Sequence, residues 1–189
     1  MEHKQSISTK RIVLTALMAA LTVAGSAIRI TIPVDIAGTT SFHLGNIICA
    51  LSGILLGPGL GALAAGIGSA IYDMMNPLYI SEAWITFLTK AAYGLAAGLV
   101  IRAGKTPWGH LRATLATAAG ALVYALLYLG KTYFYKGIFL QGLTHEAAIL
   151  AVIPKLPATA FNAVVAIIFA PILAISVKKA LEENHISLD

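Results

Sequence analysis

The stretch FHLGNIICALSGILLGPGLGALAAGIGSAIY, residues 42–72, contains no Asp, Glu, Lys or Arg and is broken only at Gly57-Pro58-Gly59. Glycine and proline in such a run mark a tight turn. The stretch therefore predicts two apolar helices, over residues 42–56 and 60–72, that lie back to back. Both are short for a membrane crossing, which takes roughly 20 helical residues. The apolar runs therefore do not define where these two helices begin and end.

Apolar runs also make up most of the remaining chain. Of the 189 residues, 58% are hydrophobic and 11% are charged, and the mean hydropathy is +0.84. Soluble domains carry about 25% charged residues. Further runs cover residues 12–28, 83–101, 111–129 and 149–177. We expect an all-α integral membrane protein, a single domain over residues 1–189 with six transmembrane helices.

The first and last runs each carry an irregular feature. The first follows basic residues and ends in Ala-Gly-Ser-Ala, like a secretory signal peptide. A retained helix is the favoured interpretation, because every later segment is also membrane-like, although cleavage stays open. The last run contains Pro154, Pro157 and Pro171, which predict a kinked or broken segment.

The distribution of basic residues predicts the orientation. The net charge of +5 does not indicate nucleic-acid binding, because the basic residues lie mostly at the ends of apolar runs and not among aromatics. The positive-inside rule favours cytoplasmic termini in a bacterial cell membrane. The inner side then holds Lys4, Lys10, Arg11, Arg102, Lys105, Arg112, Lys178 and Lys179, and the outer side Arg29, Lys131, Lys136 and Lys155. The polar loops over residues 29–41, 73–82 and 131–148 gather on the outer face.

Small residues recur at four-residue spacing in several helices. Ala16, Ala20 and Ala24 form such a stripe in the first run, and similar patterns occur at Gly57 with Gly61, Gly94 with Gly98, and Ala62, Gly66 and Ala70. Small residues let helices approach closely within lipid. The stripe on the first helix has two interpretations, internal packing or docking onto a separate membrane partner.

Lys90 lies in the middle of the fourth run, where a lysine costs at least ~2.5 kcal/mol. One explanation is an ion pair with Asp73 or Glu82. The other is a bound polar or anionic ligand, because charges within the membrane are candidates for function.

Other polar and aromatic residues would face the same outer mouth. Lys155 and Asn162 are seven residues apart and share a helical face, although Lys155 is near enough to the helix end to reach the interface and Asn162 would also suit a contact between helices. Flat rings and hydroxyl donors would suit a heteroaromatic ligand. The further candidates are Thr39, Thr40, His43, Asn46, Trp84, Tyr93 and Lys131. His43 would also suit a helix cap, and Lys131 would also suit a belt at the membrane interface. No His-x-x-His or Glu-x-x-His spacing accompanies His43 to indicate a metal site.

Three segments of the chain together resemble a known family. They are Ala16-x-x-x-Ala20 followed by Phe42-His43-Leu44-Gly45-Asn46, then GILLGPGLGALAAGIGSAIYD at residues 53–73, and PATAFNAVVAIIFAPIL at residues 157–173. The chain is similar to the substrate-binding S-components of energy-coupling factor (ECF) transporters over nearly its whole length.

The resemblance implies a six-helix protein that binds a vitamin or vitamin precursor near the outer surface. Riboflavin, hydroxymethylpyrimidine and pyridoxine-type ligands are all open, with a slight preference for the latter two. It also implies docking, through Ala16 and Ala20, onto a transmembrane coupling protein driven by two cytoplasmic ATPases. By position it adds Asp35 to the ligand-binding candidates, and it implies no cofactor. The chain has no Gly-x-x-x-x-Gly-Lys-Ser/Thr phosphate loop.

Two other classes of function compete with this interpretation. Gly66-Ile-Gly68-Ser69 is superficially like the nucleophile turn of a membrane serine protease, but no later apolar run supplies a histidine base. A stand-alone carrier would need a continuous polar stripe along several helices, which residues 42–72 hardly offer. We therefore expect a binding subunit and not an enzyme.

Overall fold

The computed structural model describes residues 8–34, 38–104 and 107–184. Its long helices are α1 (Thr9–Ala27), α2 (Gly45–Leu56), α3 (Pro58–Met74), α4 (Ala83–Arg102), α5 (His110–Gly130) and α7 (Leu156–Glu183). Shorter helices are the 3₁₀ turn η1 (Ile80–Glu82), the π-helix η2 (Lys131–Leu140), α6 (His145–Val152) and the 3₁₀ turn η3 (Ile153–Lys155). Strands β1 (Arg29–Val34) and β2 (Gly38–His43) pair antiparallel.

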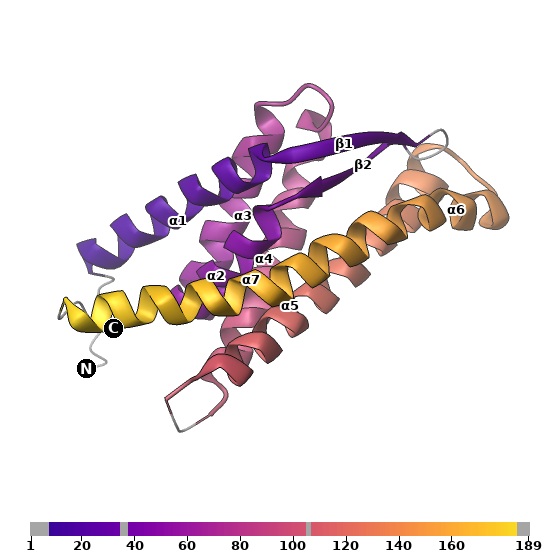
Figure 1. The fold of residues 1–189 in the computed structure, drawn as a ribbon. Coiled ribbons are helices and arrows are strands. Elements are labelled where there is room, and N and C mark those ends of the chain that lie inside the picture. Colours follow the sequence, from indigo (N-terminus) through magenta and orange to yellow (C-terminus); the bar gives the residue numbers. More distant parts are fainter. Residues whose placement is uncertain (1–7, 35–37, 105–106, 185–189) are drawn as a thin grey trace, which may run out of the picture.

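Six helical segments form the bundle, as the sequence predicts, and the all-α membrane class is confirmed (Figure 1). In the described part of the chain, four segments are long and apolar enough to cross a bilayer: Thr9–Ala27, Ile80–Arg102, His110–Leu140 and His145–Glu183. Helix α2 is apolar but shorter. The last segment is interrupted at Pro154, where the 3₁₀ turn η3 separates α6 from α7, as its prolines predict. Pro157 occupies the first turn of α7, where no intrahelical hydrogen bond is lost, and Pro171 lies within α7.

Helices α2, α3 and α4 form the centre of the bundle because glycines remove the side chains between them. Gly57 has a φ of 80°, which favours glycine, and Pro58 begins α3 directly after it. A Cβ on Gly61 would lie 2.6 Å from the Cα of Gly53, and one on Gly94 would lie 2.7 Å from the carbonyl oxygen of Gly61. The internal-packing interpretation therefore holds for these glycines.

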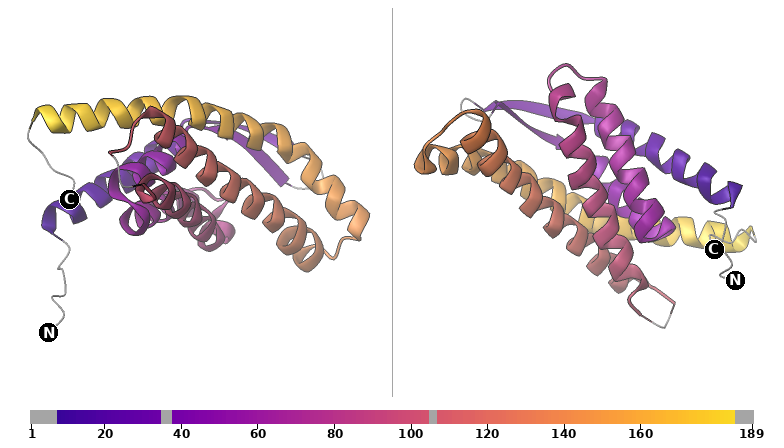
Figure 2. Two further views of the ribbon diagram at one scale, coloured as in Figure 1. Left: turned by 90° about the horizontal axis from the view of Figure 1, so that it is seen from below. Right: turned by 180° about the vertical axis from the view of Figure 1, so that it is seen from behind.

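The two ends of the molecule differ in character (Figures 1 and 2). One end holds the start of α1, the end of α7 and the connection between α4 and α5, where Lys178 Nζ lies 3.1 Å from the carbonyl oxygen of Trp108. The opposite end holds the β-hairpin, the connection between α3 and α4, and α6. The three polar loops predicted for one face therefore gather at one end.

The β-hairpin corrects the prediction for residues 29–44. We expected an irregular loop followed by a helix from residue 42, but strands run over Arg29–Val34 and Gly38–His43, and α2 begins at Gly45. The alternation Arg29-Ile30-Thr31-Ile32 has the period of two that favours a strand. A second correction concerns residues 131–140, which were assigned to a loop and extend α5 as a π-helix.

Candidate functional site

A cavity of about 210 Å³ lies at the end of the bundle that holds the hairpin. Residues from the hairpin, the ends of α3 and α4, the outer part of α5 with η2, and the start of α7 line it. Hydroxyl, amide and charged groups dominate the lining, although the surrounding helices are apolar. A polar cavity enclosed by apolar helices is the form of a binding site for a small hydrophilic molecule.

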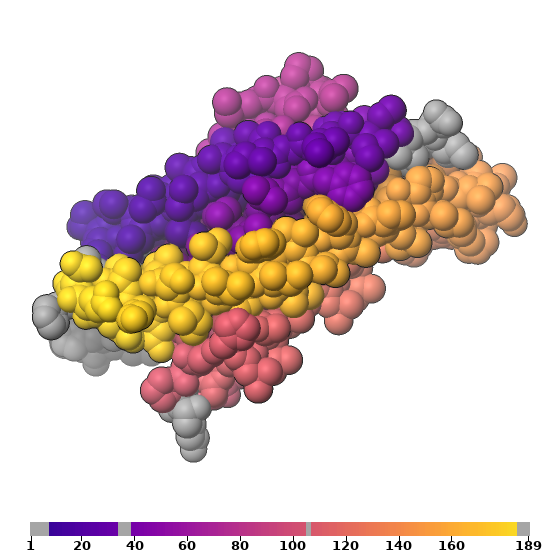
Figure 3. All heavy atoms as spheres, viewed as in Figure 1, coloured from indigo at the N-terminus to yellow at the C-terminus, as the bar shows by residue number. Residues whose placement is uncertain are grey.

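Helix α7 and the η3 turn directly before it hold the hairpin through one side chain each. The Asn162 amide donates to the carbonyl oxygen of Ser41 at 2.8 Å and accepts from the backbone N–H of His43 at 3.0 Å. Lys155 Nζ lies 3.4 Å from the carbonyl oxygen of Thr39. Residues 39, 41 and 43 alternate along β2, so α7 covers one edge of this strand (Figure 3).

A tyrosine and an arginine hold the hairpin from the other side. The hydroxyl of Tyr79 lies 3.3 Å from the hydroxyls of both Thr39 and Ser41. The Arg29 guanidinium lies over the rings of Tyr72 and Tyr79, 4.3 and 4.8 Å from their centroids. Burial raises the pKa of Tyr79, but its hydrogen bonds and the nearby Arg29 charge outweigh burial, so the pKa lies below its usual value.

The second strand ends in a histidine that faces the cavity. His43 Nδ1 accepts a hydrogen bond from the N–H of Gly45 at 3.2 Å, which is the helix-capping role considered from the sequence. Burial lowers the pKa of His43 well below 6.5, and the charges of Lys90 and Arg29 lower it further. The ring is therefore neutral at pH 7.

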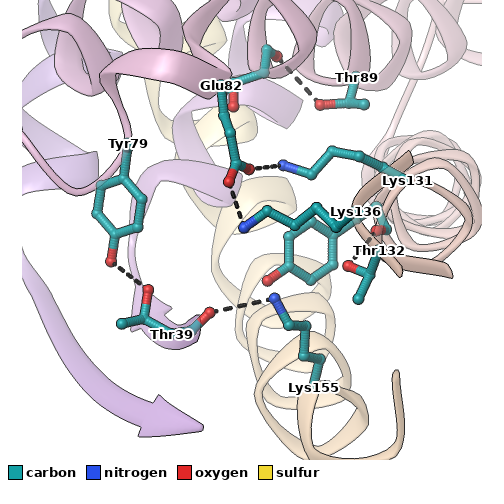
Figure 4. A network of polar contacts seen from close by, with 10 residues as sticks. Thr39, Tyr79, Glu82, Thr89, Lys131, Thr132, Lys136 and Lys155 are labelled. Carbon is teal, nitrogen blue, oxygen red and sulfur yellow. Dashed lines mark hydrogen bonds and ion pairs between the residues drawn. The ribbon is translucent and has the colours of Figure 1, made fainter. Parts of the chain in front are cut away.

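Three lysines approach one another at the rim of the cavity, and we call Lys131, Lys136 and Lys155 the outer lysine cluster. Lys131 and Lys136 both form ion pairs with Glu82, whereas Lys155 reaches the carbonyl of Thr39 (Figure 4). Lys131 and Lys136 are five residues apart, which is the hydrogen-bond spacing of a π-helix, and η2 directs both toward the same carboxylate.

Stacked tyrosines form the wall between the cavity and the core. Tyr93, Tyr124 and Tyr128, the tyrosine stack, have centroid separations of 6.0 and 5.6 Å and are tilted by only 20° and 21°. Tyr124 and Tyr128 line the cavity. Lys90 Nζ lies 3.8 Å from the Tyr124 centroid, and Lys131 and Lys155 each lie 5.6 Å from that of Tyr128. The wall thus combines flat π-surfaces with ammonium groups.

The structure brings most of the predicted ligand-binding residues to this cavity. Those that line it are Thr39, Thr40, His43, Lys90, Lys131, Lys155 and Asn162. Asn46 lies behind them and accepts a hydrogen bond from Lys90, and Tyr93 is fully buried against Tyr124. Trp84 is 53% exposed and packs on Tyr135, away from the lining residues. Asp35 lies outside the described residues.

The geometry also separates the alternatives for the two buried lysines. Lys90, 4% exposed, donates to Asn46, and no described carboxylate lies within ion-pair distance of it, so the proposed pairing with Asp73 or Glu82 is wrong. Lys155 is 2% exposed and does not extend to the interface. Both ammonium groups are enclosed in the bundle with neutral hydrogen-bond acceptors.

Several lining residues were missed as ligand-binding candidates from the sequence. They include Arg29, Asp73, Tyr79, Glu82, Tyr124, Tyr128, Lys136 and Thr159. The four-residue spacing of Tyr124 and Tyr128, continued by Lys131, places one polar stripe on the fifth helix and was a usable signal. Nothing comparable marks Arg29 or Tyr79, because the hairpin and the α3–α4 connection meet only in the folded chain.

Enzymatic or metal chemistry would depend on the serine and the potential metal ligands near this site. Among the described residues, no group of three His, Cys, Asp or Glu side chains is placed to hold a metal ion. Ser69 also lines the cavity, and its hydroxyl lies 3.8 Å from the Cys49 sulfur. That neighbour is a thiol and not the imidazole base that a serine nucleophile requires.

The fold and the cavity define a multi-pass membrane protein with a polar, cation-rich site at one end of a helical bundle. Residues 6–179 match the family model described as ECF-type riboflavin transporter, S component, and the chain belongs to this family, as its resemblance to S-components implied. It is also similar to an "Uncharacterized protein in gap 3'region" of Pyrococcus woesei, with 34% identity over 118 residues, 62% of this chain and 74% of that protein. Membership in a transporter family argues against the enzyme alternative.

Proposed function

We propose that the protein captures a water-soluble vitamin or vitamin precursor from outside the cell, as the substrate-binding subunit of an ECF-type importer. The observation that carries the proposal is the polar cavity beside the tyrosine stack, which offers ring surfaces, hydroxyl groups and buried ammonium groups together. These are the contacts that a heteroaromatic ring with polar substituents requires. Family membership supplies the transport role.

The proposed orientation places both termini in the cytoplasm of a bacterial cell and the cavity outside. The positive-inside rule supports it, because the start of α1, the end of α4 and the end of α7 lie opposite the cavity. These helix ends carry Lys10, Arg11, Arg102, Lys178 and Lys179. Accessibility of a cysteine introduced at Ser81 or at Lys179, each in a Cys49→Ser background, tests it. A membrane-impermeant thiol reagent is expected to label only the first in intact cells.

The size of the ligand is a separate question. The family description favours riboflavin. The cavity volume of about 210 Å³ is below the roughly 300–1,000 Å³ of typical ligand sites and favours a single ring, such as hydroxymethylpyrimidine or pyridoxine. Mass spectrometry of small molecules released from the purified protein tests the proposal directly. Recovery of a vitamin or precursor supports it, and purified folded protein that neither retains nor binds any of these compounds contradicts it.

The proposed partners are a transmembrane coupling protein and two cytoplasmic ATPase subunits. Ala16, Ala20 and Ala24 are exposed on α1, whereas the buried face of this helix contains Met18, Ala19 and Thr22. The alanine stripe is therefore available to another membrane protein, which supports docking over internal packing. The absence of a phosphate loop from the sequence agrees with an external energy source.

A further inference from the structure

The outer lysine cluster carries more positive charge than the residues around it neutralise. Glu82 forms ion pairs with Lys131 and Lys136, whereas Lys155 forms no ion pair among the described residues. Asp73 is the other acidic residue that lines the cavity, and Arg29 and Lys90 are its other basic residues. Five basic side chains against two carboxylates leave an excess of three positive charges in the lining.

This excess lies in a place where water cannot readily compensate for it. Lys155 is 2% exposed, and the side chains of Lys131 and Lys136 are 8% and 25% exposed. Within the described residues, the Lys155 ammonium group has one hydrogen bond, at 3.4 Å, to the neutral carbonyl oxygen of Thr39. A buried ammonium group without a counter-charge is unfavourable, and a bound anion removes the penalty.

The three lysines reach the cavity from two parts of the chain. Figure 4 shows Lys131 and Lys136 converging on Glu82 from η2, while Lys155 approaches from η3, directly before α7. All three line the same cavity as Tyr128, whose ring lies 5.6 Å from both Lys131 and Lys155. A flat ring at the tyrosine stack would therefore present its substituent to the cluster.

From this arrangement we infer that the ligand is a phosphate monoester of the vitamin, with the phosphate bound by Lys131, Lys136 and Lys155. The inference rests on the proposed function and specifies its substrate class. A phosphate monoester carries a charge of about −1.5 to −2 at pH 7, which is opposite in sign to the excess charge of the lining. Lysine binds phosphate as a point charge and needs no bidentate geometry.

Paired ligands that differ only in the phosphate test this inference. Binding of pyridoxine and pyridoxine 5′-phosphate, and of riboflavin and riboflavin 5′-phosphate, is measured by calorimetry on the purified full chain in detergent. Charge-assisted hydrogen bonds predict that one phosphate form binds roughly 10- to 100-fold more tightly than its neutral form. Equal or tighter binding of the neutral vitamin leaves the proposed function intact and overturns the inference. Binding of neither member of either pair, by folded protein, contradicts both.

Two variants distinguish a charge effect from a structural one. Lys155→Gln keeps a donor for the Thr39 carbonyl but removes the charge, so binding of the phosphate form is expected to fall by about tenfold more than binding of the neutral form. Glu82→Gln removes the competing carboxylate and is expected to strengthen phosphate binding. Lys179→Gln, at the exposed opposite end, is the matched control and should change neither.

A third comparison separates recognition of the phosphate from recognition of the ring. Inorganic phosphate alone is expected to compete only weakly, because it makes no contact with the tyrosine stack. Competition as strong as that of the vitamin phosphate would show an anion site without a vitamin specificity and would overturn the inferred ligand. Loss of binding to both members of a pair in Lys155→Gln would likewise show a structural role for this lysine.

Discussion

Asn162 in α7 accepts a 3.0 Å hydrogen bond from the backbone N–H of His43, a residue 119 positions earlier in the chain. The same amide donates to the Ser41 carbonyl at 2.8 Å. A side-chain amide thereby supplies β2 with the contacts that a third strand would provide. The hairpin that closes the cavity is consequently attached to the last helix of the bundle.

Replacing Asn162 by Ala is expected to destabilise this attachment. The backbone groups of Ser41 and His43 lose their partner, so stability should fall by about 1–3 kcal/mol, and ligand affinity should fall with it. Thermal unfolding in detergent and hydrogen exchange at residues 38–43 measure both effects. Asn184→Ala, at the exposed end of α7, is the control. Unchanged exchange in the hairpin would refute this role for Asn162.

Replacing Lys90 by Met should reduce ligand affinity without loss of the fold. The buried ammonium group contacts Asn46 and the Tyr124 ring, and removing a charged hydrogen-bonding group from a ligand costs about 1.5–3 kcal/mol, or roughly 10- to 100-fold. Thermal stability of the empty protein should be equal or higher, because an unpaired charge leaves the interior. Equilibrium dialysis gives the affinity. Full retention of binding would remove Lys90 from the site.

The tyrosine stack should contribute ring contacts to the ligand. Tyr128→Leu removes a π-surface that lines the cavity, so affinity for a flat vitamin is expected to fall by about 0.5–1.5 kcal/mol, whereas Tyr128→Phe should largely preserve it. Tyr135→Leu is the matched control, because Tyr135 packs on Trp84 outside the lining. Equal losses in the leucine and phenylalanine variants would assign the effect to the hydroxyl group instead.

Bulky residues on α1 should separate partner docking from ligand binding. Ala20→Trp fills the exposed alanine stripe, so co-purification with the coupling protein is expected to fall while affinity for the vitamin stays within twofold, roughly 0.4 kcal/mol. Leu122→Trp introduces the same side chain on exposed α5 and serves as control. Undiminished co-purification of the Ala20 variant would contradict docking through this stripe.

The neutral His43 predicts a pH dependence of stability. Its folded pKa lies well below the unfolded value of about 6.5, so between these two values the unfolded chain binds a proton that the folded chain does not. The contribution of His43 to the free energy of unfolding should be complete above pH 6.5. It should decline as the pH falls, by at most about 1.4 kcal/mol per pH unit. Unfolding temperatures from pH 7.5 to 5.5 should show a smaller decline in His43→Gln than in His110→Gln. Identical slopes would contradict the prediction.

The sequence contained enough information for the bundle but not for the elements that close its outer end. Apolar run lengths and the glycines around Pro58 predicted the helices because these signals are local. The hairpin was missed, since Pro33 and the polar residues around it favoured a loop, and its strands depend on contacts with Asn162 and Tyr79. Such contacts join distant segments and leave no local pattern.

By itself, the sequence determined a six-helix membrane protein with its polar loops at one end and with lysines in apolar surroundings. Only the tertiary structure decided which groups these lysines meet: Asn46 for Lys90, Glu82 for Lys131, and the Thr39 carbonyl for Lys155. The reason is that the hydropathy of a segment and the charges at its ends determine its insertion and orientation in the bilayer, independently of the other segments. The pairing of buried polar groups depends on how the helices pack, since each group must find a partner among the segments beside it.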